Sequence, residues 1–246
     1  MLDELKIDSQ IKDEFPDIKF DELEKYGAYY DERYCRRLVS QEMRPQRLLG
    51  HNGMNFLLNS LQRSRCLFTG FVNSINQTHK VISYLAVRAH FETTGSTAYF
   101  LQYLERFYNK EISYEEVDKI LFKLALGGKV FPDKDTIPER VDPVNVLTQI
   151  DAADKYYKKD GGEHKIFREC YDFLSEFCHP NLLGLTIASH FESSGTIAYS
   201  NNPKFTKADF GTLSSYMKIS CEYFFYLHGS CFELLKNNEE TPTLIK

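Results

Sequence analysis

The chain of 246 residues contains no tryptophan, no C-x-x-C pair and no long uninterrupted apolar run. Without C-x-x-C pairs among its six cysteines, neither a zinc-ribbon nor a thioredoxin-type site is available. No stretch reaches the roughly 18 apolar residues of a membrane-spanning helix, and the amino-terminal residues lack the basic-then-apolar pattern of a signal peptide. We therefore expect a cytoplasmic protein without membrane contact, whose cysteines are reduced.

The sequence also lacks the motifs of nucleotide-binding proteins and of serine hydrolases. It has no P-loop, no Gly-x-Gly-x-x-Gly and no Gly-x-Ser-x-Gly, and no cofactor is expected. The net charge of -5 argues against a DNA footprint, which needs a basic face. A local patch for RNA or phosphate stays open, because arginines gather in the first quarter of the chain: Arg33, Arg36, Arg37, Arg44, Arg47, Arg63 and Arg65.

What the sequence does have is aromatic residues, 16 Tyr and 19 Phe, and apolar residues at helical spacing. Ser113 and Glu116 form a capping-box pattern, and Asp142 followed by Pro143 is typical of a helix start. We expect an all-α fold, a bundle of about seven helices. Their expected ranges are 20–42, 54–75, 78–108, 113–126, 142–158, 163–179 and 206–235.

Between the helices, Pro and Gly residues predict a break at 44–53 and a loop at 127–142. Alternating apolar residues and a Ser193-Ser-Gly195 turn predict one small β-hairpin at 185–199. No linker stands out. We expect a flexible or docked N-terminal arm at 1–19, a single helical domain at 20–236 and a frayed C-terminal tail at 237–246.

One string of residues occurs twice in similar form. His90–Tyr99 and His190–Tyr199 match at an offset of one hundred residues, yet their flanks disagree. The first copy lies in a helical pattern, and the second alternates like a strand. Because a true duplication extends further, we interpret the match as a coincidence.

The predicted helix over 78–108 carries charge on a side that otherwise suits the core. At 100° per residue, Val81, Leu85, Arg88 and Glu92 fall near one line. The opposite side carries the polar residues His79, Ser83, His90, Thr93 and Thr97. An inward Arg88 and Glu92 either form an internal salt bridge or line a pocket where Arg88 binds a phosphate or carboxylate.

The predicted helix over 163–179 has a similar polar edge, formed by Arg168, Asp172, Ser175 and His179. Either His179 caps the helix end while Asn181 holds the turn, or His179 acts as an acid or base at a cleft. Glu176-x-x-His179 has the spacing of di-iron bundles, which makes a di-metal bundle a weaker alternative. Because no second such motif occurs, no metal site is expected.

Two segments carry a resemblance to known proteins. Tyr171-Asp-Phe-Leu-Ser175-Glu-Phe-Cys-His179-Pro-Asn181 and Arg88-Ala-His-Phe-Glu92 resemble a pattern of uncharacterised bacterial all-α families, loosely similar to HEPN-type helical domains. The resemblance covers residues 55–235. It implies a homodimer, an RNA or phosphate-containing ligand, and a role in bacterial stress or phage defence.

HEPN-type ribonucleases cleave RNA without metal, using an Arg, four to six residues and then a His. Here Arg168 precedes His179 by eleven positions, and Arg44-x6-His51 fits the count but falls in a predicted loop. The expected function is therefore ligand or partner binding without catalysis, and the alternative is a metal-independent endoribonuclease with His179 or His51 as base.

The candidate catalytic residues are His179, Arg88 and Glu92. The candidate ligand-binding residues are Arg88, Glu92, Arg168, Tyr171, Ser175, His179 and Asn181.

Overall fold

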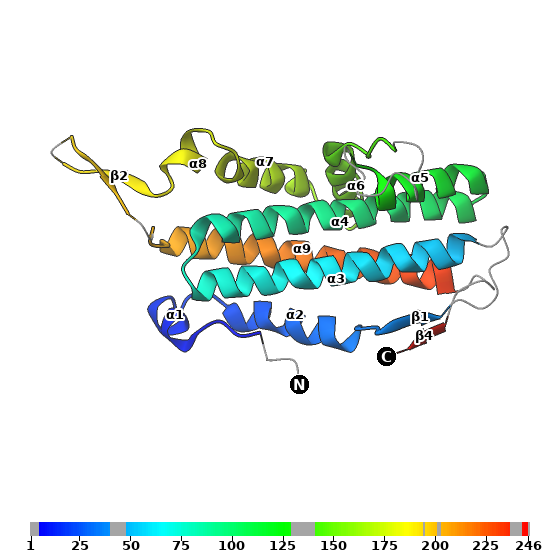
Figure 1. Cartoon of the computed structure of the whole chain (residues 1–246), viewed down its shortest axis with the longest axis horizontal. Coiled ribbons are helices and arrows are strands. Elements are labelled where there is room, and N and C mark those ends of the chain that lie inside the picture. The colour runs from blue at the N-terminus through cyan, green and yellow to red at the C-terminus, as the bar shows by residue number, and fades with distance from the viewer. Residues whose placement is uncertain are drawn as a thin grey trace, which may run out of the picture. The chain divides into compact units, whose positions relative to one another are not determined.

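The structure, a computed structural model, describes residues 5–39, 48–128, 141–193, 195–200, 203–236 and 243–245. Nine helices and two two-stranded sheets account for most of these residues, which confirms the all-α prediction (Figure 1). The helices are α1 (Ser9–Glu14), α2 (Phe20–Glu32), α3 (Leu48–Asn76), α4 (Lys80–Tyr108), α5 (Tyr114–Leu126), α6 (Val146–Lys159), α7 (Ile166–Cys178), α8 (Leu182–Thr186) and α9 (Lys207–Lys236). The strands are β1 (Arg37–Val39), β2 (Ser189–Phe191), β3 (Ile197–Tyr199) and β4 (Thr243–Ile245).

The chain forms two compact units. Unit 1 comprises Met1–Arg33, Arg63–Phe91 and Ile166–Glu222, and unit 2 comprises Tyr34–Gln62, Glu92–Lys165 and Tyr223–Lys246. The boundaries fall inside α3, α4 and α9, so each long helix contributes one part to each unit. The single domain expected from the sequence stays a prediction.

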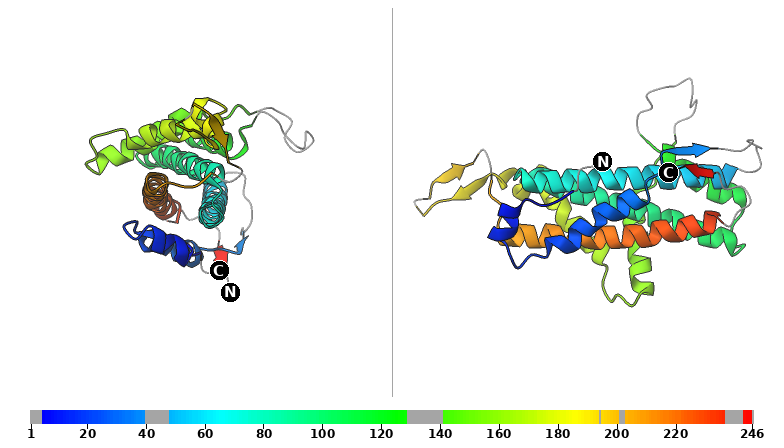
Figure 2. Two further views of the ribbon diagram at one scale, coloured as in Figure 1. Left: turned by 90° about the vertical axis from the view of Figure 1, so that its left-hand side faces the viewer. Right: turned by 90° about the horizontal axis from the view of Figure 1, so that it is seen from below.

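Unit 1 is built in layers around the parts of α3 and α9 that belong to it. The end-on view in Figure 2 shows α2 on one side of these helices, and α4 followed by α7 on the other. Phe68, Phe71, Val72 and Ile75 repeat at helical spacing on α3 and are fully or almost fully buried. Phe91 packs against Phe167 with ring centroids 5.4 Å apart, which joins α4 to α7.

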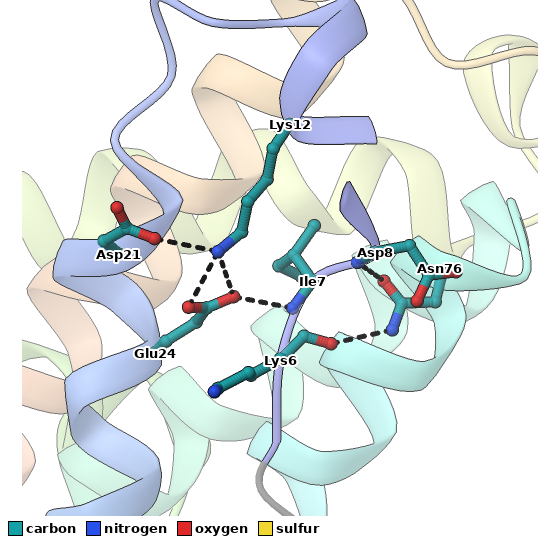
Figure 3. A network of polar contacts seen from close by, with 7 residues as sticks. All are labelled: Lys6, Ile7, Asp8, Lys12, Asp21, Glu24 and Asn76. Atoms are coloured by element: carbon teal, nitrogen blue, oxygen red, sulfur yellow. Dashed lines mark hydrogen bonds and ion pairs between the residues drawn. The ribbon is translucent and has the colours of Figure 1, made fainter. Parts of the chain in front are cut away.

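The N-terminal arm is docked on unit 1 from residue 5 onward. Figure 3 shows the contacts: Asn76 at the end of α3 accepts from the Asp8 amide at 3.0 Å and donates to the Lys6 carbonyl at 2.9 Å. Glu24 of α2 accepts from the Ile7 amide at 2.7 Å. Ile7 and Ile11 are buried, so of the two alternatives for the arm, docking holds over residues 5–19.

Unit 2 depends on close approaches at glycines. Gly53 of α3 faces Leu235 of α9, and an added Cβ would lie 3.0 Å from both Leu235 methyl carbons. Gly95 of α4 faces the α6 backbone, where an added Cβ would lie 2.9 Å from the Gln149 carbonyl. The predicted break at 44–53 is therefore wrong from Leu48 onward. Gly53 lies inside α3, and its missing side chain leaves the space that α9 needs.

Helix starts show where side-chain caps decide a boundary. The Ser113 side chain accepts from the Glu116 amide, and Glu116 accepts from the Ser113 amide, so the predicted capping box of α5 is confirmed. The predicted Asp142 cap of α6 is wrong. Asn145 caps α6 instead, because its side chain accepts from the Leu147 amide at 2.8 Å.

The helix predicted over 20–42 ends early, at Glu32. β1 follows and pairs antiparallel with β4, with Leu38 opposite Leu244. The frayed tail is thereby wrong for residues 243–245. The apolar spacing of α2 continues to Leu38, and only pairing with a strand some 200 positions away along the chain gives that segment its extended conformation.

The predicted hairpin is confirmed in a shorter form. β2 and β3 pair antiparallel, with Phe191 opposite Ile197. Leu185 and Thr186, expected in the first strand, belong to α8. Asn181 caps that short helix by accepting from the Gly184 amide at 3.1 Å, which turns the following residues helical.

We predict opposite effects for two helical glycines. Gly95→Ala places a methyl group 2.9 Å from the α6 backbone, so we expect a loss of about 1–3 kcal/mol in the free energy of unfolding. Gly70→Ala in α3 has nothing within 4 Å and should gain about 0.5–1 kcal/mol from helix propensity. Urea denaturation measures both, and equal effects would contradict the close approach of α4 and α6.

Candidate functional site

The side of α4 that faces inward in unit 1 is the reverse of the predicted one. Val81 and Leu85 are exposed, and Arg88 is half-buried, whereas Ser83 and His90 are fully buried. The inward-stripe prediction is therefore wrong for Val81 and Leu85. Helical spacing determines which residues share a side, but small polar residues turn inward here because partners on other helices satisfy them.

The buried side of α4 carries a hydrogen-bonded group around His90. The imidazole Nδ1 lies 2.7 Å from the Ser220 hydroxyl of α9. Its Nε2 lies 2.7 Å from the Ser64 hydroxyl of α3 and 3.0 Å from the Tyr30 hydroxyl of α2. Tyr30 and Ser64 are themselves 2.6 Å apart, and the Cys221 sulfur lies 3.7 Å from Nε2. We call these five residues the His90 network.

Complete burial determines the chemistry of the His90 network. All five residues are buried with no measurable exposure, and desolvation lowers the pKa of His90 to about 3. Burial also raises the pKa of Tyr30 well above its ordinary value. The imidazole is therefore neutral, with one nitrogen donating and the other accepting. A substrate therefore has no access to the network. Its hydrogen bonds instead hold α2, α3, α4 and α9 together within unit 1.

A second polar group joins α4 to α7 and includes three of the predicted site residues. Arg88 Nε donates to the Ser175 hydroxyl at 3.1 Å, and its terminal NH2 donates to the Tyr171 hydroxyl at 2.7 Å. The guanidinium also lies 4.9 Å from the centre of the Tyr171 ring. These contacts attach α7 to α4 at the half-buried edge of unit 1.

The other predicted site residues follow along α4, along α7 and just beyond the end of α7. Glu92 is half-buried on α4, one turn beyond Arg88. Arg168 forms an ion pair with Asp172 at 3.1 Å on α7. His179 is exposed just beyond the end of α7. Asn181 caps α8 and donates to Glu176 at 2.8 Å, so it does hold the turn.

His51, the alternative base, lies in the first turns of α3 rather than in a loop. Its Nδ1 is buried without a hydrogen-bond partner. Arg44 lies outside the described residues.

Within the described ranges, no three His, Cys, Asp or Glu residues come together as a group that could hold a metal ion. None of the helices in the described part of the chain is both long enough and apolar enough to cross a membrane.

The two matching strings adopt different structures. His90–Tyr99 is helical within α4, whereas the second string supplies β2 and β3, and His190 is exposed where His90 is buried. The strings thus share letters and no structural role. The first string can be buried because neighbouring helices supply hydrogen-bond partners for its polar side chains.

A concentration of exposed apolar side chains in unit 1 was not predicted from the sequence. Of the thirteen large apolar side chains that are exposed in the described residues, six lie on α8 and the β2–β3 hairpin. We call these six the hairpin surface: Leu182, Leu183, Leu185, Phe191, Ile197 and Tyr199. One sequence signal was available, because Glu192 is the only formally charged residue between Cys178 and Ser200.

The register places the strand members of the hairpin surface on one face. Phe191 is opposite Ile197, and Tyr199 lies two positions after Ile197, so these three side chains point the same way. His190 and Ala198 are opposite each other on the other face. The hairpin closes with Gly195 at φ +79, a conformation that suits glycine. Figures 1 and 2 show the hairpin projecting past the ends of the helices of unit 1.

We predict that acid destabilises the protein through His90. Its folded pKa lies below the unfolded value near 6.5, so the unfolded chain binds the extra proton and stability falls as the pH drops below about 6.5. Between pH 7 and pH 5 the loss should be about 2 kcal/mol.

Urea denaturation at several pH values separates this contribution from those of other groups. His90→Gln should be less stable at pH 7, by roughly 1–3 kcal/mol, and should lose most of the slope between pH 7 and 5. His190→Gln, at an exposed position, should keep both stability and slope. A slope that persists in His90→Gln would contradict the assignment.

We also predict that Arg88 stabilises the α4–α7 junction. Arg88→Ala removes two hydrogen bonds and a ring contact, and should cost about 1–3 kcal/mol in the free energy of unfolding. Lys236→Ala removes an exposed ion pair with Glu233 on one helix and should cost at most about 0.5 kcal/mol. Equal losses for the two variants in urea denaturation would contradict a special role for Arg88.

Comparison with known proteins adds no family to this geometry. No protein-family description, no curated protein and no solved structure matches the chain. The two polar groups and the hairpin surface are the features of the described residues that bear on function.

Proposed function

We propose that this chain is a non-catalytic binding protein that docks a partner protein on the hairpin surface. The observation that carries the proposal is the exposure of its six large apolar side chains, which leave between 42% and 81% of their surface in water. Monomeric proteins rarely expose contiguous apolar patches beyond a few hundred Å², and larger patches mark interaction sites.

The structure of the hairpin supports the same conclusion. An isolated two-stranded hairpin is marginally stable in water, because it needs a third strand or a packed face. β2 and β3 pair only with each other among the described strands. The face with Phe191, Ile197 and Tyr199 is exposed. A partner protein that covers this face supplies the missing packing.

The Arg88 contacts serve this surface indirectly. Arg88 attaches α7 to α4, and α8 and the hairpin follow directly from the end of α7. Tyr84 of α4 stacks on Phe177 in the last turn of α7, with ring centroids 4.1 Å apart. In this proposal Arg88, Tyr171 and Ser175 position the docking surface, and exposed His179 lies at its base. The HEPN-like setting, in bacterial stress or phage defence, remains part of the proposal.

Site-specific photo-crosslinking in cells that make the protein tests the proposal. A photoreactive phenylalanine analogue in place of Phe191 or Tyr199 should give a discrete protein adduct. The same analogue in place of Phe122 or Tyr226, which are exposed in unit 2, should give none. An absence of adducts at both hairpin positions would overturn the proposal.

Catalysis is tested on the purified protein. In our proposal no RNA is cleaved in the presence of EDTA. RNA cleavage by the wild type that is lost in His179→Ala or in His51→Ala would overturn the non-catalytic assignment and favour the endoribonuclease. The two variants separate the two candidate bases.

A further inference from the structure

The first part of the N-terminal arm lies on unit 1 in the way that a bound peptide lies on its receptor. Its polar contacts go to Asp21 and Glu24 of α2 and to Asn76 of α3, which we call the arm site. We propose that the arm site is a peptide-docking surface that the arm occupies as a built-in competitor. The hairpin surface takes no part in this contact, so the inference goes beyond the proposed function.

The first contacts are made with the main chain of the arm rather than with its side chains. Asn76 accepts from the Asp8 amide at 3.0 Å and donates to the Lys6 carbonyl at 2.9 Å (Figure 3). One side chain thereby holds the residues on both sides of Ile7. Glu24 accepts from the Ile7 amide at 2.7 Å. Hydrogen bonds to the main chain supply affinity for an extended segment whatever its side chains are.

Two apolar side chains and one ammonium group make the contact selective. Ile7 and Ile11 are the buried residues of the segment 5–14, and the others are exposed or half-buried. Lys12 follows directly and donates to Asp21 at 2.8 Å and to Glu24 at 2.9 Å. The external ligand is therefore a segment of a partner protein with the arm's own pattern, an isoleucine, three residues, a second isoleucine and a lysine.

The segment before Phe15 has the properties of an exchangeable ligand. It buries two side chains, and α1 has six residues, too few for a helix that is stable alone. Segments with few buried apolar contacts open at the low end of the local unfolding free energies. The Phe15 ring lies 4.6 Å from the Phe210 ring of α9 and anchors the arm behind this segment. The tethered arm therefore competes at an effective concentration on the order of millimolar.

Fluorescence anisotropy with a labelled synthetic peptide of residues 5–14 tests the proposal on the full-length protein. The double variant Ile7→Ser/Ile11→Ser should bind the peptide at least tenfold more tightly than the wild type, because its own arm competes less. In that background Asn76→Ala should weaken binding at least fivefold, since two hydrogen bonds to the main chain are lost. Asn73→Ala, at an exposed position of the same helix, should change the affinity less than twofold.

Peptide variants test the ligand pattern. A peptide with serine at both isoleucine positions should not bind, because it has no apolar side chain to bury at these positions. A peptide with glutamine in place of Lys12 should bind roughly threefold more weakly, and this difference should shrink at high salt. Equal binding of all three peptides would contradict the proposed pattern.

Absence of peptide binding to the double variant would overturn the proposal. Circular dichroism checks that the double variant keeps its helices, and hydrogen exchange of the wild type gives an answer that needs no variant. The Ile7 and Asp8 amides should exchange at least 100-fold faster than the amides of Phe71 and Val72, which are buried in α3. Exchange as slow as that of α3 would mean that the arm opens only when the protein unfolds, so no external segment could reach the arm site.

Discussion

A neutral histidine with no contact with water constrains unit 1. His90 needs a partner at each ring nitrogen, because an unsatisfied buried polar atom costs about 1–3 kcal/mol. Ser64, Ser220 and Tyr30 supply these partners from α3, α9 and α2. These three helices must therefore lie at one position along α4, each in one rotation about its own axis. An apolar core would tolerate sliding, whereas this network is satisfied in a single register.

The same unit combines this closed interior with an open surface. The His90 network holds the inner helices, and the contacts of Arg88 with Tyr171 and Ser175 hold α7 at their edge. α8 and the hairpin continue from α7 and expose their apolar side chains. A rigid interior suits a binding surface, because a partner then gains contacts without first ordering the scaffold.

Prediction from sequence succeeded where the cause is local. The capping box of α5 needs only Ser113 and Glu116, three residues apart. Two candidate site residues, Arg88 and Ser175, do come into contact, although the inward stripe predicted for Arg88 was wrong for its neighbours Val81 and Leu85. The role of His90 could not be predicted, since its partners lie 26, 60 and 130 positions away along the chain.

The sequence by itself determined the helical class, most helix ranges and the small hairpin, because hydrophobic spacing, caps and glycines act over a few residues. The tertiary structure alone decided which side of α4 turns inward, and it paired β1 with β4. It also made one His-Phe-Glu string helical and the other part of a hairpin. The physical reason is that the burial of a side chain depends on which other helices pack against it. A serine or histidine becomes a core residue only where another helix brings the hydrogen-bond partner it needs.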